Sequence, residues 1–304
     1  MQAVIAALAP IFMLIAIGWA LRRIRLADDA FWAGLERFMY FFLMPALIVK
    51  ELSNARLGQY EPLQLIAAML AALIAMSAIV LALRPLLRVD GPAFTSIFQG
   101  AVRFNTFVGL GAAQALYQSE GVALFAVAMA TLIPALNVVC VSVLVRYAGT
   151  SPGSIGEQLR QILRNPLIVA CAVGIAFNLL GLRITGAVGV AADLLGKSAV
   201  AMGLLTVGAA LDIASLHRVR WPLLIVIVGK LLVFPLVMAA SCQVFGIDGL
   251  ARTIVILWAT LPTAPAAYIL ARQLGGDASL MAAGVTATTL AAALSMPPLL
   301  DWLI

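Results

Sequence analysis

Four ionisable side chains lie inside long apolar stretches of the sequence. Arg103 and Lys230 each stand near the middle of such a stretch, and Asp193 and Lys197 lie four residues apart in another. Charge at that depth is costly in an apolar environment and is a functional candidate by default. The two cations suit an anionic ligand. Snorkelling, or a bond to a carbonyl of a neighbouring helix, is the alternative explanation.

Asp193 and Lys197 are spaced by one helical turn, so they share one face of a helix. The simpler interpretation is an internal ion pair that lowers the cost of placing both groups in an apolar stretch. The alternative is a site for a coupling ion, a proton or a substrate. Both residues are therefore predicted as ion-coupling candidates.

Two further polar side chains could hold a ligand, because Asn105 and Asn137 each offer a hydrogen-bond donor and an acceptor. Gln114 and Tyr268 are weaker candidates that could simply bridge helices. The sequence has no GxSxG, P-loop, HExxH, carboxylate-rich metal motif or Gly-rich dinucleotide fingerprint. We therefore expect no enzymatic activity, no catalytic residue, no cofactor and no metal.

Helix-breaking residues cluster in two segments, 103–111 and 260–265. The breakers are Gly109, Gly111, Pro262 and Pro265. Proline removes a backbone donor, and glycine permits non-helical angles or close backbone approach. Irregular backbone inside a bilayer is tolerated only where it lines a cavity or packs in protein, and freed helix ends attract anions. The alternative is close helix packing at Gly and an ordinary kink at Pro.

The composition is that of a membrane protein. Hydrophobic residues make up 64% of the 304 residues and charged residues only 11%, too few to cover a water-soluble surface. We predict an all-α polytopic membrane protein with ten transmembrane helices, since apolar runs near 20 residues suffice to span a bilayer. The predicted spans are 3–21, 35–52, 63–83, 93–115, 122–145, 166–182, 188–211, 221–245, 250–271 and 280–304.

Basic residues are unevenly shared between alternate loops. Twelve Arg lie on one side of the predicted spans, and four Lys or Arg lie on the other. The positive-inside rule then places both termini on the non-cytoplasmic side and the polar connection 149–164 in the cytoplasm. The net charge of +6 is explained by orientation, so no nucleic-acid partner is expected.

An internal repeat appears when the sequence is shifted by 156 positions. The shift places Pro10 on Pro166 and Gly18 on Gly174, and segment 106–109 on segment 262–265. Two five-span halves, 1–148 and 165–304, would insert in opposite orientations, as in many secondary transporters. A chance match of small residues is the alternative.

These residues resemble the auxin efflux carrier family, over essentially the whole chain. The matching strings are Arg103-x-Asn105-x-x-x-Gly109-x-Gly111, Glu120-Gly121, Asn137, Asn165-Pro166, Gly203 to Gly208 with Leu211, and Leu261-Pro262 through Ala271 to Gly276-Asp277. The resemblance implies two inverted five-helix repeats in which broken helices 4 and 9 cross at the site. It also implies a scaffold of helices 1, 2, 6 and 7, often dimeric, and an elevator-like transport unit of helices 3–5 and 8–10. Gly111 stands where many relatives have proline.

Together the residues and the resemblance predict a secondary transporter or uniporter in the inner (cytoplasmic) membrane. Its cargo would be a small organic anion: a mono- or dicarboxylate or an auxin-like acid. The predicted substrate-binding residues are Arg103, Asn105, Gly109, Gly111, Asn137, Lys230, Pro262 and Pro265. The alternatives are a sodium-coupled carrier of the bile-acid type, a transporter-derived membrane sensor without flux, and an intramembrane enzyme acting on lipid.

Overall fold

The computed structural model describes residues 1–56, 62–149, 160, 163–217 and 221–304, and the secondary structure in these ranges is helical. Most of the predicted linker 149–164 lies outside the described residues. The helices are α1 (Gln2–Arg23), α2 (Asp29–Phe38), α3 (Met44–Asn54), α4 (Pro62–Leu87), α5 (Gly91–Val102), α6 (Thr106–Ala148), α8 (Pro166–Leu179), α9 (Gly186–Ala209), α10 (Trp221–Val228), α11 (Phe234–Val244), α12 (Gly249–Thr260), α13 (Ala266–Gln273) and α14 (Ala278–Leu303). Short π or 3-10 turns are η1 (Met39–Leu43), η3 (Ile213–His217) and η4 (Gly229–Val233).

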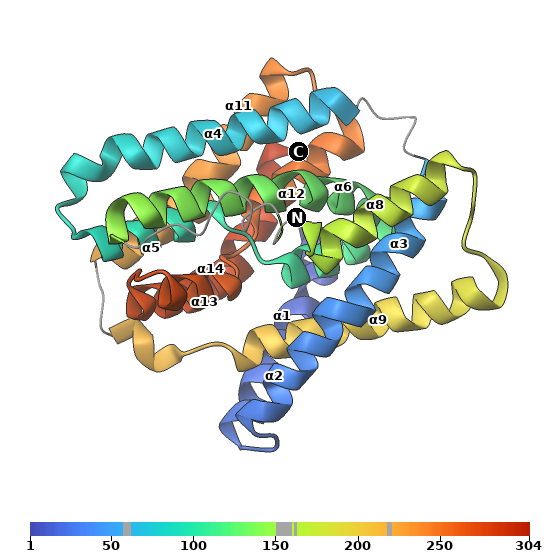
Figure 1. The fold of residues 1–304 in the computed structure, drawn as a ribbon, viewed down its shortest axis with the longest axis horizontal. Helices are drawn as coiled ribbons and strands as arrows, with labels where there is room; N and C mark the ends of the chain where they lie inside the picture. Colours follow the sequence, from blue (N-terminus) through green and yellow to red (C-terminus); the bar gives the residue numbers. More distant parts are fainter. Residues whose placement is uncertain (57–61, 150–159, 161–162, 218–220) are drawn as a thin grey trace.

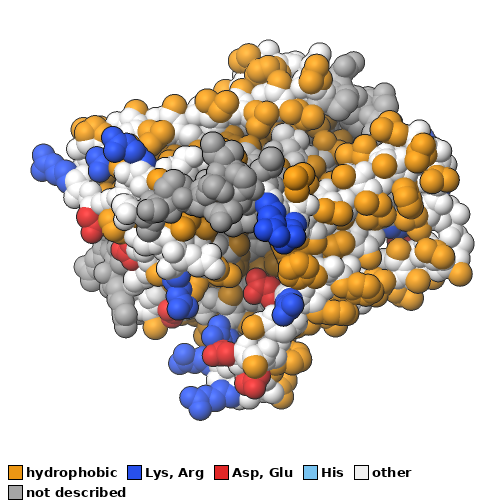
Figure 2. Space-filling view, in the orientation of Figure 1, with side chains coloured by type: hydrophobic (Ala, Val, Ile, Leu, Met, Phe, Trp, Pro, Cys, Tyr) orange, Lys and Arg blue, Asp and Glu red, His pale blue; other side chains and the backbone are white. Residues whose placement is uncertain are grey.

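Seven helical stretches in the described part of the chain are long and apolar enough, by length and composition, to cross a membrane. One of them runs over 58 residues, Gly91–Ala148, and two shorter apolar helices are Pro166–Leu179 and Gly249–Thr260. Apolar side chains are spread over the face in Figure 2, and charged side chains gather at its left side and in its lower lobe, with a few near the middle. The protein is therefore a multi-pass membrane protein.

Each predicted span falls on a helix or on two helices in succession. Two spans contain a widened π turn, and in both a proline follows it by two residues: Pro45 after η1 and Pro235 after η4. A proline ring clashes with the carbonyl four residues earlier in an α-helix, and a π turn moves that carbonyl away. The widened turn lets the span continue through the proline.

The helices pack as two groups, joined through α6 and through contacts of α14 with α1 and η3. In one group α1 packs on α9, and α3 packs on both α8 and α9. In the other, α4, α5 and α10 to α14 pack on one another. Figure 1 shows the first group, in blue and yellow, below and to the right of the second. The helix α6 contacts both groups and therefore connects them.

Glycines allow α1 and α9 to touch backbone to backbone. A Cβ placed on Gly208 would overlap the carbonyl oxygen of Ile15, and one on Gly18 would overlap that of Leu205. Close approach of this kind is how small residues stabilise helix pairs in a bilayer, where the hydrophobic effect does not drive association. The α1–α9 pair is therefore fixed by its glycines.

Replacing Gly208 with alanine should separate these helices and lower stability by about 3 kcal/mol. The loss would appear as a fall of roughly 5–10 °C in the unfolding temperature of the purified protein in detergent. Gly34→Ala is the matched control, because a Cβ there meets no atom within 4 Å. Equal unfolding temperatures for the two variants would contradict the assignment.

Candidate functional site

The first helix break occupies residues 103–105, between α5 and α6. Asn105 has extended backbone angles, and its Oδ1 accepts hydrogen bonds from the backbone N–H groups of Phe107 (3.1 Å) and Val108 (3.3 Å). An asparagine cap of this kind satisfies donors that a new helix otherwise leaves free. Asn105 thus starts α6 in the interior of the protein, where its side chain is fully buried.

The break is shorter than the sequence predicted, because Gly109 and Gly111 lie inside α6. The prediction that the chain unwinds through both glycines is wrong: the Asn105 cap restores the helix first. Gly109 instead provides space, since a Cβ there would overlap the Phe125 ring and lie 2.7 Å from Leu261 Cδ1. Gly111 faces α9 with ordinary van der Waals room for a Cβ.

The second break occupies residues 261–265, between α12 and α13. Pro262 and Pro265 bracket it, and Pro265 is the residue that precedes the first turn of α13. The predicted unwinding at these prolines is present. Thr263 holds the strand-like segment in place, because its N–H donates to Thr288 Oγ1 (3.1 Å) on α14. The break is therefore ordered and buried.

The two breaks touch each other directly. The backbone N–H of Asn105 donates to the carbonyl oxygen of Pro262 at 2.9 Å. The hydroxyl of Thr263 donates to the carbonyl oxygen of Gly100, in the last turns of α5, at 2.7 Å. Segments about 160 residues apart in the sequence thus supply each other with the partners that their interrupted helices lack.

Buried polar atoms without a hydrogen-bond partner concentrate around this crossing. Ten such side-chain atoms occur in the described residues, and six of them belong to Gln99, Arg103, Asn105, Lys230 and Trp258. Five of the six are N–H donors, and only Gln99 Oε1 is an acceptor. Buried unpaired groups of this kind are rare in native proteins, and an ordered water, an ion or a ligand would satisfy them. A ligand rich in acceptors would match them.

Arg103 and Asn137, both predicted from the sequence, lie together. Arg103 Nη2 donates to Asn137 Oδ1 at 2.9 Å, while Arg103 Nε is buried without a partner. Asn137 belongs to the second part of α6, beyond the kink at Gln118. The pair joins the first break to the next predicted span and directs a guanidinium group into the protein.

Lys230, also predicted from the sequence, is fully buried in the π turn η4. Its Nζ lies 4.7 Å from the centroid of the Phe234 ring and 5.3 Å from that of the Trp258 ring, with no hydrogen-bond partner. Both distances allow cation–π attraction. Since Trp258 belongs to the last turn of α12, Lys230 lies close behind the second break and not on an open surface.

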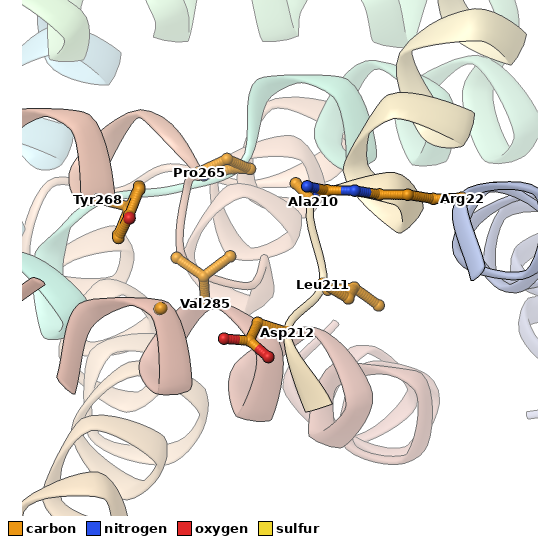
Figure 3. A pocket seen from close by; sticks show the side chains of 8 residues that line it. Arg22, Ala210, Leu211, Asp212, Pro265, Tyr268 and Val285 are labelled. Carbon is orange, nitrogen blue, oxygen red and sulfur yellow. The ribbon is translucent and has the colours of Figure 1, made fainter. Parts of the chain in front are cut away.

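A cavity of about 330 Å³ opens next to the second break (Figure 3). Pro265 of the second break, Tyr268 of α13 and Val285 of α14 form one wall, and Arg22 of α1 and Asp212 form the other. The cavity therefore lies between the two groups of helices. The N–H of Asp212 also donates to Thr286 Oγ1 (3.0 Å), which joins the chain after α9 to α14.

The sequence treated Arg22 only as a marker of orientation, and Tyr268 as a weak candidate. Arg22 donates to the carbonyl oxygen of Ala209 at the end of α9 (2.5 Å) and to Asp29 (2.9 Å). A second hollow of about 390 Å³ shares Arg22 and Asp212 with the first and adds Arg23 and Arg25. In the sequence, these arginine-lined cavities were signalled by the three arginines that follow the first predicted span.

A second pair of cavities, about 400 and 440 Å³, lies beside a cluster of charges near the other end of α9. Lys50 Nζ lies 2.6 Å from Asp193 Oδ1 and 3.0 Å from Glu51 Oε1. Among the described residues no contact of ion-pair length joins Asp193 to Lys197. The predicted pair within α9 is therefore wrong, because Lys50 on α3 reaches Asp193 first. Lys197 and Gln114 both line the cavity of about 400 Å³.

Removing the Lys50 charge should destabilise the protein, because Glu51 is only 4% exposed and would be left without its cation. We expect Lys50→Met to lower the stability by about 2–3 kcal/mol. Lys50→Met/Glu51→Gln should recover most of this loss, since no buried charge then remains unpaired. Thermal unfolding in detergent measures both variants. A double variant no more stable than the single one would contradict the pairing.

Comparison with known proteins bears on the second half of the chain. Residues 153–300 match the profile of a family described as membrane transport protein. The matched region contains α8 to α13, most of α14 and the second helix break. No protein among those with curated descriptions matches the chain.

Proposed function

The chain belongs, through the match over residues 153–300, to the membrane transport protein family, the auxin efflux carrier family, and on this premise we propose that it carries a small organic anion. The proposed process is secondary transport or uniport of a mono- or dicarboxylate, or an auxin-like acid, across the inner membrane. The observation that carries the proposal is the meeting of two helix breaks among buried donors without partners.

The proposed substrate site is the crossing itself. A carboxylate there would accept hydrogen bonds from Asn105 Nδ2 and Arg103 Nε, the unpaired donors of the first break. Asn137 would hold the Arg103 guanidinium in position. Gly109, Gly111, Pro262 and Pro265 would shape the site through the backbone, because they set where the helices stop and how closely they approach.

The proposed architecture has ten spans in two inverted halves, 1–148 and 165–304, joined by a cytoplasmic linker. The kink at Gln118 would divide the 58-residue stretch into two spans, and α8 and α12 with α13 would supply two more. The grouping of α1, α3, α8 and α9 supports a scaffold of helices 1, 2, 6 and 7. In this proposal the scaffold also forms a homodimer, and both termini lie outside the cytoplasm.

The two sets of cavities support alternating access. One set contains Arg22 and Asp212, beyond the end of α9, and the other contains Asp193. From Asp193 to Ala210 a helix rises about 26 Å, so in this proposal the two sets of cavities face opposite sides of the bilayer. Between them, Phe107 of α6 packs against Gly203 of α9. Movement of the crossing along α9 would expose the substrate first to one cavity and then to the other.

The energy source in this proposal is the membrane potential or a proton. The potential is worth about 2.3 kcal/mol per charge for each 100 mV. A sodium-coupled carrier of the bile-acid type would instead need several acidic or hydroxyl ligands at the crossing. The unpaired polar atoms there are mainly N–H donors, and the hydroxyls of Thr263 and Thr288 already donate to backbone carbonyl oxygens, which favours an anion over a metal cation.

Counterflow into proteoliposomes tests the proposal. Vesicles preloaded with unlabelled succinate, malate, phenylacetate or indole-3-acetate should take up the same labelled anion faster than empty vesicles, and faster than vesicles without protein. Sodium should have no effect, whereas a sodium requirement would favour the bile-acid type. Counterflow of none of these anions would favour a sensor without flux.

A further inference from the structure

Two positive charges lie within the membrane-spanning part of the proposed transport unit. Lys230 is ten residues into the stretch Trp221–Val244, and Arg103 ends the first half-helix, twelve residues after Gly91. At 1.5 Å per residue these positions lie about 14 and 18 Å from the nearest start of a span. Both residues are therefore near the middle of a hydrocarbon core about 30 Å thick.

Neither cation has an acidic partner among the residues that the structure describes. The ion pairs formed by the described residues include neither Arg103 nor Lys230. Arg103 donates to a neutral amide, and Lys230 Nζ lies near two aromatic rings. Cation–π attraction leaves the net charge of a protonated lysine unchanged, so no acidic group of the described residues cancels the charge that Arg103 and a protonated Lys230 bring to the crossing.

The helices around Lys230 carry almost no other charge. The elements packed against η4 are α5, α10, α11, α12 and α14. In these helices the charged residues are Arg252 and Asp301. Arg252 stands near the start of α12 opposite Asp248, and Asp301 near the end of α14 pairs with the amino-terminal ammonium. Among the helices packed against η4, no charged residue therefore lies as deep as Lys230.

We propose that Arg103 and Lys230 are the charges through which the membrane voltage acts on this carrier. The inference rests on the proposed function, because the two cations must move with the crossing. The empty unit would then move with a charge near +2, and a bound anion would offset it. A dianion would make the loaded unit neutral, whereas a monoanion would leave about one positive charge.

The consequence is that voltage controls different steps for different cargo. Exchange requires only the loaded unit to move. Because the unit loaded with a dianion is neutral in this proposal, the rate of dianion exchange should not depend on the voltage. Net transport also requires the empty unit to return, and that step moves positive charge. One charge crossing the whole of a 100 mV field changes the distribution between the two faces by about fifty-fold.

The test measures exchange and net flux in proteoliposomes at 0 and −100 mV, set with potassium and valinomycin. Radiolabelled succinate serves as the dianion and phenylacetate as the monoanion. In the wild-type protein we expect succinate exchange to change by less than about twofold, and net succinate flux to change about fivefold or more. Phenylacetate exchange should depend on voltage, with the sign expected when the loaded unit carries about one positive charge.

Lys230→Met should make succinate exchange depend on voltage, because the loaded unit would then carry a charge of about −1. The sign of this dependence should be opposite to that of phenylacetate exchange in the wild-type protein. Lys230→Gln provides the same charge change in a second variant, and Lys230→Arg should restore the wild-type response. Arg88→Met is the matched control, since it removes an exposed charge at the end of α4 and should leave both voltage responses unchanged.

The outcomes separate the inference from the proposed function. Exchange that persists in Lys230→Met and Lys230→Gln with the wild-type voltage response would overturn the inference and leave the carrier function intact. Absence of exchange for succinate, phenylacetate and the rest of the anion panel in the wild-type protein would overturn the carrier function, and the inference with it.

Discussion

Asn105→Ala is expected to lower anion counterflow by about a hundredfold. Asn105 combines two roles: its Oδ1 caps α6, and its Nδ2 is a buried donor without a protein partner at the crossing. A hydrogen bond to a charged ligand contributes about 1.5–3 kcal/mol, which accounts for most of the loss. The measurement is the initial rate of counterflow at equal amounts of inserted protein.

The chain contains a matched control for the capping role. Asn165 caps α8 in the same way, with its Oδ1 accepting from the N–H groups of Leu167 (3.0 Å) and Ile168 (3.4 Å). Loss of either cap should cost about 1 kcal/mol of stability. Asn165→Ala should therefore lower the unfolding temperature as much as Asn105→Ala does, yet preserve counterflow. Similar transport by the two variants would remove Asn105 from the site.

Asn105→Asp separates capping from binding within one residue. Aspartate keeps an oxygen that can cap α6, but it replaces the Nδ2 donor with a negative charge. We expect this variant to be stable and inactive, because the carboxylate repels an anion at the crossing. Activity above that of Asn105→Ala would show that the cap, and not the donor, is what transport requires.

The second large effect is expected at Arg103. Arg103→Gln should raise the half-saturating anion concentration by about thirtyfold or more, which corresponds to about 2 kcal/mol. Glutamine ends two bonds short of the guanidinium Nη2 that contacts Asn137, so the charge, the fork of donors and this contact are lost together. Concentration dependence of counterflow measures the effect.

Arg103→Lys distinguishes charge from geometry. Lysine keeps the charge but offers no planar pair of donors, so affinity should recover only in part. Asn137→Ala should weaken binding less than Arg103→Gln, because it removes the group that orients the guanidinium and leaves the guanidinium itself. Wild-type affinity in Arg103→Gln would contradict a role in anion binding.

The sequence predicted the elements of this fold well because their signals are local. An apolar run defines a span wherever its neighbours lie, and Pro262 and Pro265 interrupt a helix by their own covalent structure. Residues of the second break were therefore found from the sequence alone. The extent of the first break was not, because glycine only permits a break, whereas the Asn105 cap decides where the next helix starts.

Contacts between distant helices could not be predicted in the same way. Asp193 and Lys197 had the spacing of an ion pair, but the choice of partner depended on how close α3 lies to α9, which brings Lys50 within 2.6 Å. The cavity beside Arg22 and Asp212 likewise exists only where α1, α9, α13 and α14 converge. Such features depend on packing across more than a hundred residues of sequence.

The bond between the two breaks is made by main-chain atoms, the N–H of Asn105 and the carbonyl of Pro262. Every amino acid except proline supplies that donor at position 105, and every amino acid supplies that acceptor at position 262. Mutation of the neighbouring side chains can therefore change the preferred substrate without breaking this hydrogen bond. Proteins that evolve from this chain could therefore change their substrate preference and keep the backbone hydrogen bond that holds the two breaks together.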